Sequence, residues 1–135
     1  MNYFIDTCVW RDFYENRKSL SGKPLGSYAA SCFTTLFKKK ACILISETLI
    51  MELSKDYGLP EIQRMLGLIK IRAIPITKQE FVEARQLSRE KDIPFGDCLN
   101  AVQARNHHAI LVTRDHHFFN ELKEITPAVL PEDVN

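Results

Sequence analysis

Four carboxylates in this sequence follow or adjoin segments that resemble the strands of a parallel sheet. Asp6 comes directly after the first apolar run of the chain, and Asp115 lies just past Thr113 at the end of a later one. Asp97 stands at the start of a helical segment, and Glu52 lies inside the helical segment that follows the second apolar run. Ligands of open α/β sheets bind outside the carboxyl ends of the strands, so we expect the four acids to meet at one edge.

The chemistry of such a cluster follows from electrostatics. Carboxylates held close together repel one another, and each raises the pKa of its neighbours unless a cation neutralises them. Hard oxygen ligands suit Mg²⁺ or Mn²⁺, and Mg²⁺ retains water molecules when it binds. A bound ion lowers the pKa of a water and stabilises the entering and leaving oxygens of a phosphodiester. The four acids therefore predict a hydrolytic centre with one or two divalent ions.

Each acid also has an ordinary structural explanation. Asp97 and Asp115 are natural N-caps for the helices that follow them, and Asp6 could end its strand in an Asx-turn. Glu52 could be a helix-face residue paired with Lys55. Only their common place at the predicted edge of the sheet favours a shared site.

The elements that would position these acids alternate along the chain. Buried strands are predicted at residues 3–5, 42–45, 71–75 and 110–113, with a weaker fifth strand at 128–130. Helices are predicted at residues 28–40, 46–57, 61–70, 78–91 and 96–108, with stops or caps at Gly58 and Thr77 and a flexible loop at 16–27. This alternation is typical of βαβ units and a parallel sheet.

Composition places limits on the class of protein. The 135 residues can bury enough apolar surface to fold as one domain, residues 1–135. With 18 Lys and Arg against 17 Asp and Glu, the whole molecule has no general attraction for nucleic acid or membrane. The four cysteines lack zinc-finger or disulfide spacing, and no apolar run is long enough to cross a membrane. We expect a cytoplasmic protein with reduced thiols and no membrane association.

Four segments resemble those of PIN-domain ribonucleases, especially the small toxins of the VapC type. They are "FIDTCVW" (4–10), "SETLIMELSK" (46–55), "GDCLNAVQA" (96–104) and "AILVTRDHHF" (109–118). The resemblance implies a three-layer α/β/α sandwich with a parallel sheet of about five strands. It also implies that Asp6, Glu52, Asp97 and Asp115 form the catalytic and metal-binding set.

The same resemblance assigns supporting roles to other residues. Thr7 and Thr113 match hydroxyl positions that orient the metal centre, and Asn100 falls one helical turn after Asp97. Arg114, Arg11 and Lys55 are candidates for guiding the RNA backbone, and the alternative for each is a solvated surface charge. Two positions depart from the family pattern: His117 stands where a second acid is common, and Cys8 replaces a serine or asparagine. We expect activity to survive both departures because neither removes one of the four acids.

The resemblance implies an Mg²⁺- or Mn²⁺-dependent endoribonuclease that acts as the toxin of a toxin–antitoxin pair. Its partners would be an RNA substrate, a cognate antitoxin and a second copy of the chain. Two alternatives stay open: a PIN-domain nuclease in RNA processing or decay, and a catalytically silent module that binds RNA or protein.

A different catalytic hypothesis uses histidines. His107, His108, His116 and His117 could cleave RNA without metal or could bind zinc. Adjacent histidines are expected to point apart, so that each pair offers at most one ring, and zinc-like ligand spacing is absent from the sequence. We therefore favour the carboxylates.

Overall fold

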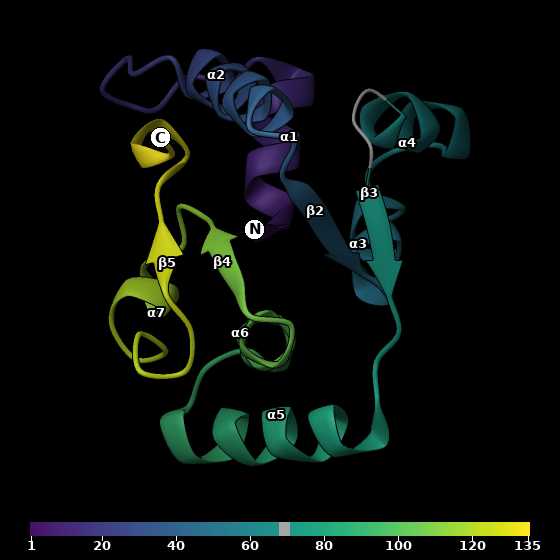
Figure 1. Ribbon diagram of the computed structural model, residues 1–135, viewed down its shortest axis with the longest axis vertical. Helices are drawn as coiled ribbons and strands as arrows, with labels where there is room; N and C mark the ends of the chain where they lie inside the picture. Colours follow the sequence, from purple (N-terminus) through teal and green to yellow (C-terminus); the bar gives the residue numbers. More distant parts are fainter. Residues whose placement is uncertain (68–70) are drawn as a thin grey trace.

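A computed structural model describes residues 1–67 and 71–135 (Figure 1). Its strands are β1 (Asn2–Ile5), β2 (Cys42–Ser46), β3 (Ile71–Ile74), β4 (Ala109–Val112) and β5 (Ala128–Val129). Its helices are α1 (Thr7–Glu15), α2 (Leu25–Lys38), α3 (Glu47–Leu53), α4 (Leu59–Leu66), α5 (Lys78–Lys91), α6 (Phe95–Asn106) and α7 (His116–Phe119), followed by a 3₁₀ helix (Pro131–Asp133).

Within the described ranges, five strands form one sheet in the order β3-β2-β1-β4-β5, and all four pairings are parallel. The central strand β1 pairs with β2 through Phe4 opposite Leu44, and with β4 through Phe4 opposite Leu111. The chain moves outward from β1 to β3 and then returns to the other side of β1 at β4. That reversal makes the carboxyl ends of β1 and β4 the switch point of the sheet, which is where open α/β folds bind ligands.

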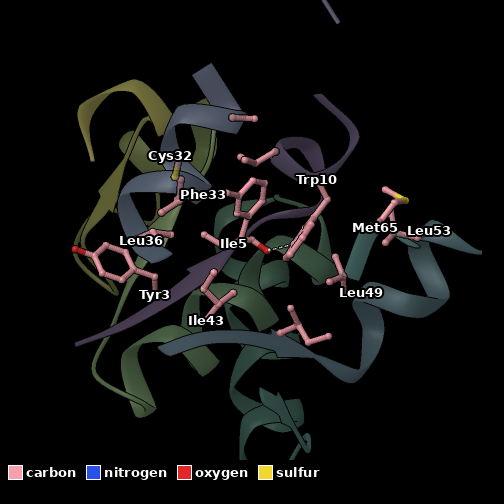
Figure 2. Packing of buried hydrophobic residues seen from close by; sticks show 14 of the residues in the cluster. Tyr3, Ile5, Trp10, Cys32, Phe33, Leu36, Ile43, Leu49, Leu53 and Met65 are labelled. Atoms are coloured by element: carbon pink, nitrogen blue, oxygen red, sulfur yellow. Dashed lines mark hydrogen bonds between the residues drawn. The ribbon is translucent and has the colours of Figure 1, made fainter. Parts of the chain in front are cut away.

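Alternating side chains of the strands build two separate cores. Tyr3 and Ile5 of β1 pack with residues of α1 to α4, including Trp10, whose indole Nε1 donates a hydrogen bond to the Ile5 carbonyl (Figure 2). Phe4 points to the opposite face and joins residues of α5, α6 and α7. Figure 1 shows α1 and α2 on one side of the sheet and α5 and α6 on the other. The predicted three-layer α/β/α sandwich is therefore confirmed.

Local details differ from expectation at several elements. Helix α1 was not predicted; it begins where the Asp6 side chain accepts a hydrogen bond from the Thr7 amide. Gly58 was expected to stop a helix, but α3 ends at Leu53 and Gly58 is the N-cap of α4. The helix predicted at 61–70 begins earlier and ends at Leu66, and its last three residues lie outside the described ranges.

The predicted cap at Thr77 is confirmed. The Thr77 hydroxyl accepts from the Glu80 amide while the Glu80 carboxylate accepts from the Thr77 amide, which is a complete capping box. Among the described helices, none combines the length and apolar character that a membrane crossing needs.

Candidate metal centre

Three of the four acids lie in segments that follow the carboxyl ends of β1, β2 and β4. Asp6 follows β1 directly, Glu52 lies on α3 just after β2, and Asp115 lies three residues past the end of β4. Asp97 is in the first turn of α6, which packs beside these strands. Because β1 lies between β2 and β4, acids from three neighbouring strands converge on one edge.

Asp6 is the most deeply buried of the four, with an exposed fraction of 8%. Its carboxylate accepts hydrogen bonds from the Thr7 amide at 2.9 Å, the Thr113 hydroxyl at 2.8 Å and the Cys8 thiol at 3.6 Å. Burial raises the pKa of Asp6 above its usual value, Glu52 adds to that rise, and the bonds from Thr113, Thr7 and Cys8 oppose it. The carboxylate is therefore fixed in place, and within the described part of the chain no cationic side chain offsets its charge.

Asp97 and Asp115 form the second part of the cluster. Burial and the nearby Asp115 and Asp6 carboxylates raise the pKa of Asp97 to about 7, and a side-chain hydrogen bond to Asp115 contributes to that rise. Asp115 is the N-cap of α7 and accepts from the His117 amide at 3.0 Å. The N-cap of α6 is Pro94, so Asp97 is not the cap that its position suggested.

Glu52 is the fourth acid of the cluster and lies next to Asp6. Its carboxylate accepts a short hydrogen bond from the Thr7 hydroxyl and lies close enough to Asp6 to raise that residue's pKa. Asn100 lines a small pocket together with Thr7 and Glu52. A Cβ atom at Gly96 would lie 3.5 Å from Glu52 Oε1, so the first turn of α6 runs beside this carboxylate.

Threonine hydroxyls connect the acids to one another. Thr113 is fully buried; its hydroxyl donates to Asp6 and accepts from the Asp115 amide at 3.0 Å. Thr7 connects Asp6 and Glu52: its amide donates a hydrogen bond to Asp6 and its hydroxyl donates one to Glu52. The two threonines therefore hold the acids at a defined spacing, which is the arrangement that orients metal ligands.

The Cys8 thiol stays protonated beside Asp6. Burial is the main cause that raises the pKa of Cys8 to about 12, and the Asp6 carboxylate adds to it. The thiol can therefore donate to Asp6, as a serine hydroxyl at that position would.

The three cations predicted to guide RNA have different surroundings. Lys55 is exposed, whereas Arg11 forms an ion pair with Asp56 and approaches the Glu52 carbonyl at 3.5 Å. Arg114 contacts Asp12 at 3.4 Å and Glu132 at 2.7 Å, and its guanidinium lies over the Tyr28 ring. Two of the three charges are thus engaged within the fold.

Asp12 is a residue that sequence reasoning missed. Its side chain is 3% exposed and contacts Arg17 at 3.0 Å as well as Arg114. The buried position of Asp12 on α1 could have been recognised only if that helix had been predicted.

The histidines also differ from expectation. The rings of His116 and His117 do not point apart: their centroids are 4.2 Å apart. Within residues 1–67 and 71–135, the set of three His, Cys, Asp or Glu ligand atoms that all lie within 4.8 Å of one another is Asp115, His116 and His117.

The four acids are more widely spread than this set, and their electrostatic contacts run in sequence from Glu52 through Asp6 to Asp97 and Asp115.

Replacing Thr113 with valine should weaken metal binding about 10- to 100-fold, as is typical when a partner of the ligands is removed. Valine keeps the shape of the side chain but loses the bonds to Asp6 and the Asp115 amide. Titration calorimetry with Mn²⁺ measures the effect. The control is Thr126→Val, at a buried threonine whose hydroxyl instead faces the Ala109 carbonyl. Equal affinities for the two variants would contradict the role of Thr113.

Comparisons with known proteins agree with this architecture. The PIN domain family model matches residues 3–124. Solved structures with the same fold include VapBC2 from Rickettsia felis bound to a promoter DNA fragment, with 20% identity, a TM-score of 0.69, and coverage of 96% of this chain and 98% of that one. A toxin–antitoxin complex from Klebsiella pneumoniae has 20% identity, a TM-score of 0.68, and coverage of 96% and 97%.

FitAcB from Neisseria gonorrhoeae has 15% identity to this chain and a TM-score of 0.65, with coverage of 98% of this chain and 99% of that one. No curated protein matches the sequence. At these identities the solved structures establish the shared fold.

Proposed function

The chain belongs to the PIN domain family, and from this premise we propose that it is an Mg²⁺- or Mn²⁺-dependent endoribonuclease, the toxin of a toxin–antitoxin pair. The observation that supports this most directly is the uncompensated negative charge of the cluster. Burial and neighbouring carboxylates raise the pKa values of Asp6 and Asp97, with only a smaller opposing effect of His117 on Asp97, and no lysine or arginine of residues 1–67 and 71–135 bonds to either acid. A fold gains nothing in stability from such a cluster, which suits a site that binds a cation.

The donor set fits a hard divalent ion. Asp6, Asp97, Asp115 and Glu52 offer carboxylate oxygens, the ligands that Mg²⁺ and Mn²⁺ prefer. We assign Asp6, Asp97 and Asp115 to holding the ion, directly or through water. When bound, the ion supplies a water of lowered pKa and stabilises the charge that develops on the phosphate.

The chain's own residues then position the reaction. Glu52, held by the Thr7 hydroxyl, is placed to orient the attacking water or to accept its proton. Thr113 keeps Asp6 and Asp115 at a constant spacing, and Asn100 borders the same pocket as Glu52. The products would be a 5′-phosphate and a 3′-hydroxyl. Lys55 has an exposed charge and is the best placed of the three proposed cations to contact the RNA backbone. Arg11 and Arg114 would add to the positive electrostatic potential without bonding to the RNA directly.

Partners follow from the same proposal. The solved structures that share this fold include toxin–antitoxin complexes, and we propose a cognate antitoxin and a homodimer for this chain as well. Large apolar side chains are exposed on α3 and at the start of α4, namely Ile50, Met51 and Leu59. Such surfaces are typical of protein contact sites. The protein would act as one domain in the cytoplasm, where its RNA substrate is found.

The proposal is tested by incubating the purified chain with a mixture of cellular RNAs and Mg²⁺ or Mn²⁺, and mapping new 5′ ends. We expect discrete cuts that bear a 5′-phosphate and that EDTA abolishes. Metal-independent cleavage that is lost in His116→Ala and retained in Asp6→Asn would instead support the histidine hypothesis. Binding of RNA without any cleavage would support the silent module.

The metal-free protein should be more stable at pH 5 than at pH 8. The folded pKa of Asp97 is about 7 against an ordinary value of 3.8, so the folded state retains a proton that the unfolded chain has lost. Stability from this group therefore falls as the pH rises from about 4 to 7. Thermal unfolding in EDTA should show this fall for the wild type and a smaller one for Asp97→Asn. Mg²⁺ or Mn²⁺ should restore stability at pH 8; an increase in stability with pH in EDTA would contradict the assignment.

A further inference from the structure

Two histidine rings face each other at the edge of the acid cluster. The ring centroids of His116 and His117 are 4.2 Å apart, and His116 Nδ1 lies 3.7 Å from Asp115 Oδ1. One ligand atom from each of Asp115, His116 and His117 lies within 4.8 Å of the other two. The His116 side chain is 72% exposed, so it can rotate to shorten these distances. Two nitrogen donors and one carboxylate oxygen can therefore reach a single ion.

Two of these three groups are already oriented. Asp115 Oδ1 accepts a hydrogen bond from the His117 amide at 3.0 Å, and the Asp115 carboxylate also forms a side-chain hydrogen bond with Asp97. His117 Nδ1 lies 3.4 Å from Glu121 Oε2, one helical turn on. A carboxylate on one ring nitrogen fixes the tautomer and the orientation of a histidine, and presents the other nitrogen, Nε2, to a metal.

We propose that Asp115, His116 and His117 form a site for a borderline divalent transition-metal ion of the Zn²⁺ class. Imidazole nitrogens suit Zn²⁺, Co²⁺ and Ni²⁺, whereas Mg²⁺ prefers oxygen, so the donor set separates this site from the carboxylate cluster. Three protein ligands leave a fourth position for water. Asp115 belongs to both sites, and occupancy of one therefore changes the affinity of the other. The site rests on the geometry of these residues and does not require nuclease activity.

The chain supplies its own matched control in a second pair of adjacent histidines. His107 Nδ1 is 2.9 Å from the Gln103 carbonyl, and His108 is exposed with a left-handed backbone, φ 52°. Neither belongs to the set of close ligand atoms found among the described residues. Changing this pair removes the same number of imidazoles without touching the proposed site.

The experiment compares zinc binding by three forms of the full chain after EDTA treatment and removal of the chelator. They are the wild type, a double variant with His116→Gln and His117→Gln, and the control with His107→Gln and His108→Asn, since asparagine tolerates the left-handed backbone. Titration calorimetry with Zn²⁺ and with Mg²⁺ gives the affinities, and the visible spectrum of bound Co²⁺ reports the ligand types. Thermal unfolding in EDTA verifies that each form is folded.

We expect the double variant to lose at least about tenfold in Zn²⁺ affinity, while the control matches the wild type and Mg²⁺ binding falls far less. Asp6→Asn should retain zinc binding, because Asp6 lies outside the set. Equal zinc affinity in all three forms would overturn the site. So would loss of zinc in Asp6→Asn, which would place the ion among the carboxylates, or a thiolate charge-transfer band with Co²⁺, which would place it at one of the four free cysteines. RNA cleavage is measured separately, so these outcomes are independent of the proposed nuclease.

Discussion

Replacing Asp97 with asparagine should reduce RNA cleavage at least about 100-fold, since even partners of metal ligands contribute 10- to 100-fold. Asp97 lies at the centre of the cluster: its pKa is raised by both Asp115 and Asp6. Asparagine has nearly the same shape but offers one neutral oxygen, so it binds a divalent ion poorly. The measurement is growth arrest and new RNA 5′ ends when either form is expressed in a heterologous cell without an antitoxin.

This change should not unfold the protein. Removing a charge that the folded state disfavours should stabilise the metal-free chain at pH 8, so a loss of activity cannot be attributed to loss of fold. Asp92→Asn is the matched control, because Asp92 is an exposed acid at the C-cap of α5 with a left-handed backbone that asparagine accepts. Equal growth arrest by the wild type and by Asp97→Asn would reject the catalytic assignment of the cluster.

The strands were predictable because burial on both faces leaves continuous apolar runs. Each of the five predicted strands overlaps an observed one, and the observed bounds differ by at most one residue at either end. Helix α1 was missed because its first turn directly follows Asp6 without a loop. The order of the strands in the sheet could not be predicted either, because hydrophobic periodicity does not determine which parallel strands are neighbours.

In the candidate site, likewise, some features could be predicted from the sequence and others could not. The positions of Asp6, Glu52 and Asp115 relative to strands follow from the sequence, because strand ends are visible in it. The connections made by Thr113 and the facing rings of His116 and His117 depend on side-chain directions that spacing alone does not determine. Arg114 shows the limit most clearly: an arginine between two site residues suggested contact with RNA, but the fold directs it inward to Asp12 and Glu132.

Replacing Asp12 with alanine should lower the free energy of unfolding by about 3 kcal/mol, because removing one partner of a buried ion pair leaves the other charge unpaired. The Asp12 side chain is 3% exposed, and the Arg114 side chain is 18% exposed. We use the lower end of the usual range because Arg114 keeps Glu132 and the half-exposed Arg17 can reach water. The melting temperature should fall by roughly 10 °C.

Urea unfolding of Asp12→Ala and Asp56→Ala provides the comparison. Asp56 also pairs with an arginine, Arg11, but is 55% exposed, so its loss should lower stability by less than about 1 kcal/mol. Combining Asp12→Leu with Arg114→Met should recover much of the stability, because no buried charge is then left alone. An effect of Asp12→Ala as small as that of Asp56→Ala would show that the Arg114 charge is solvated. The Arg114 guanidinium would then be free to contact the RNA backbone, as the sequence analysis suggested.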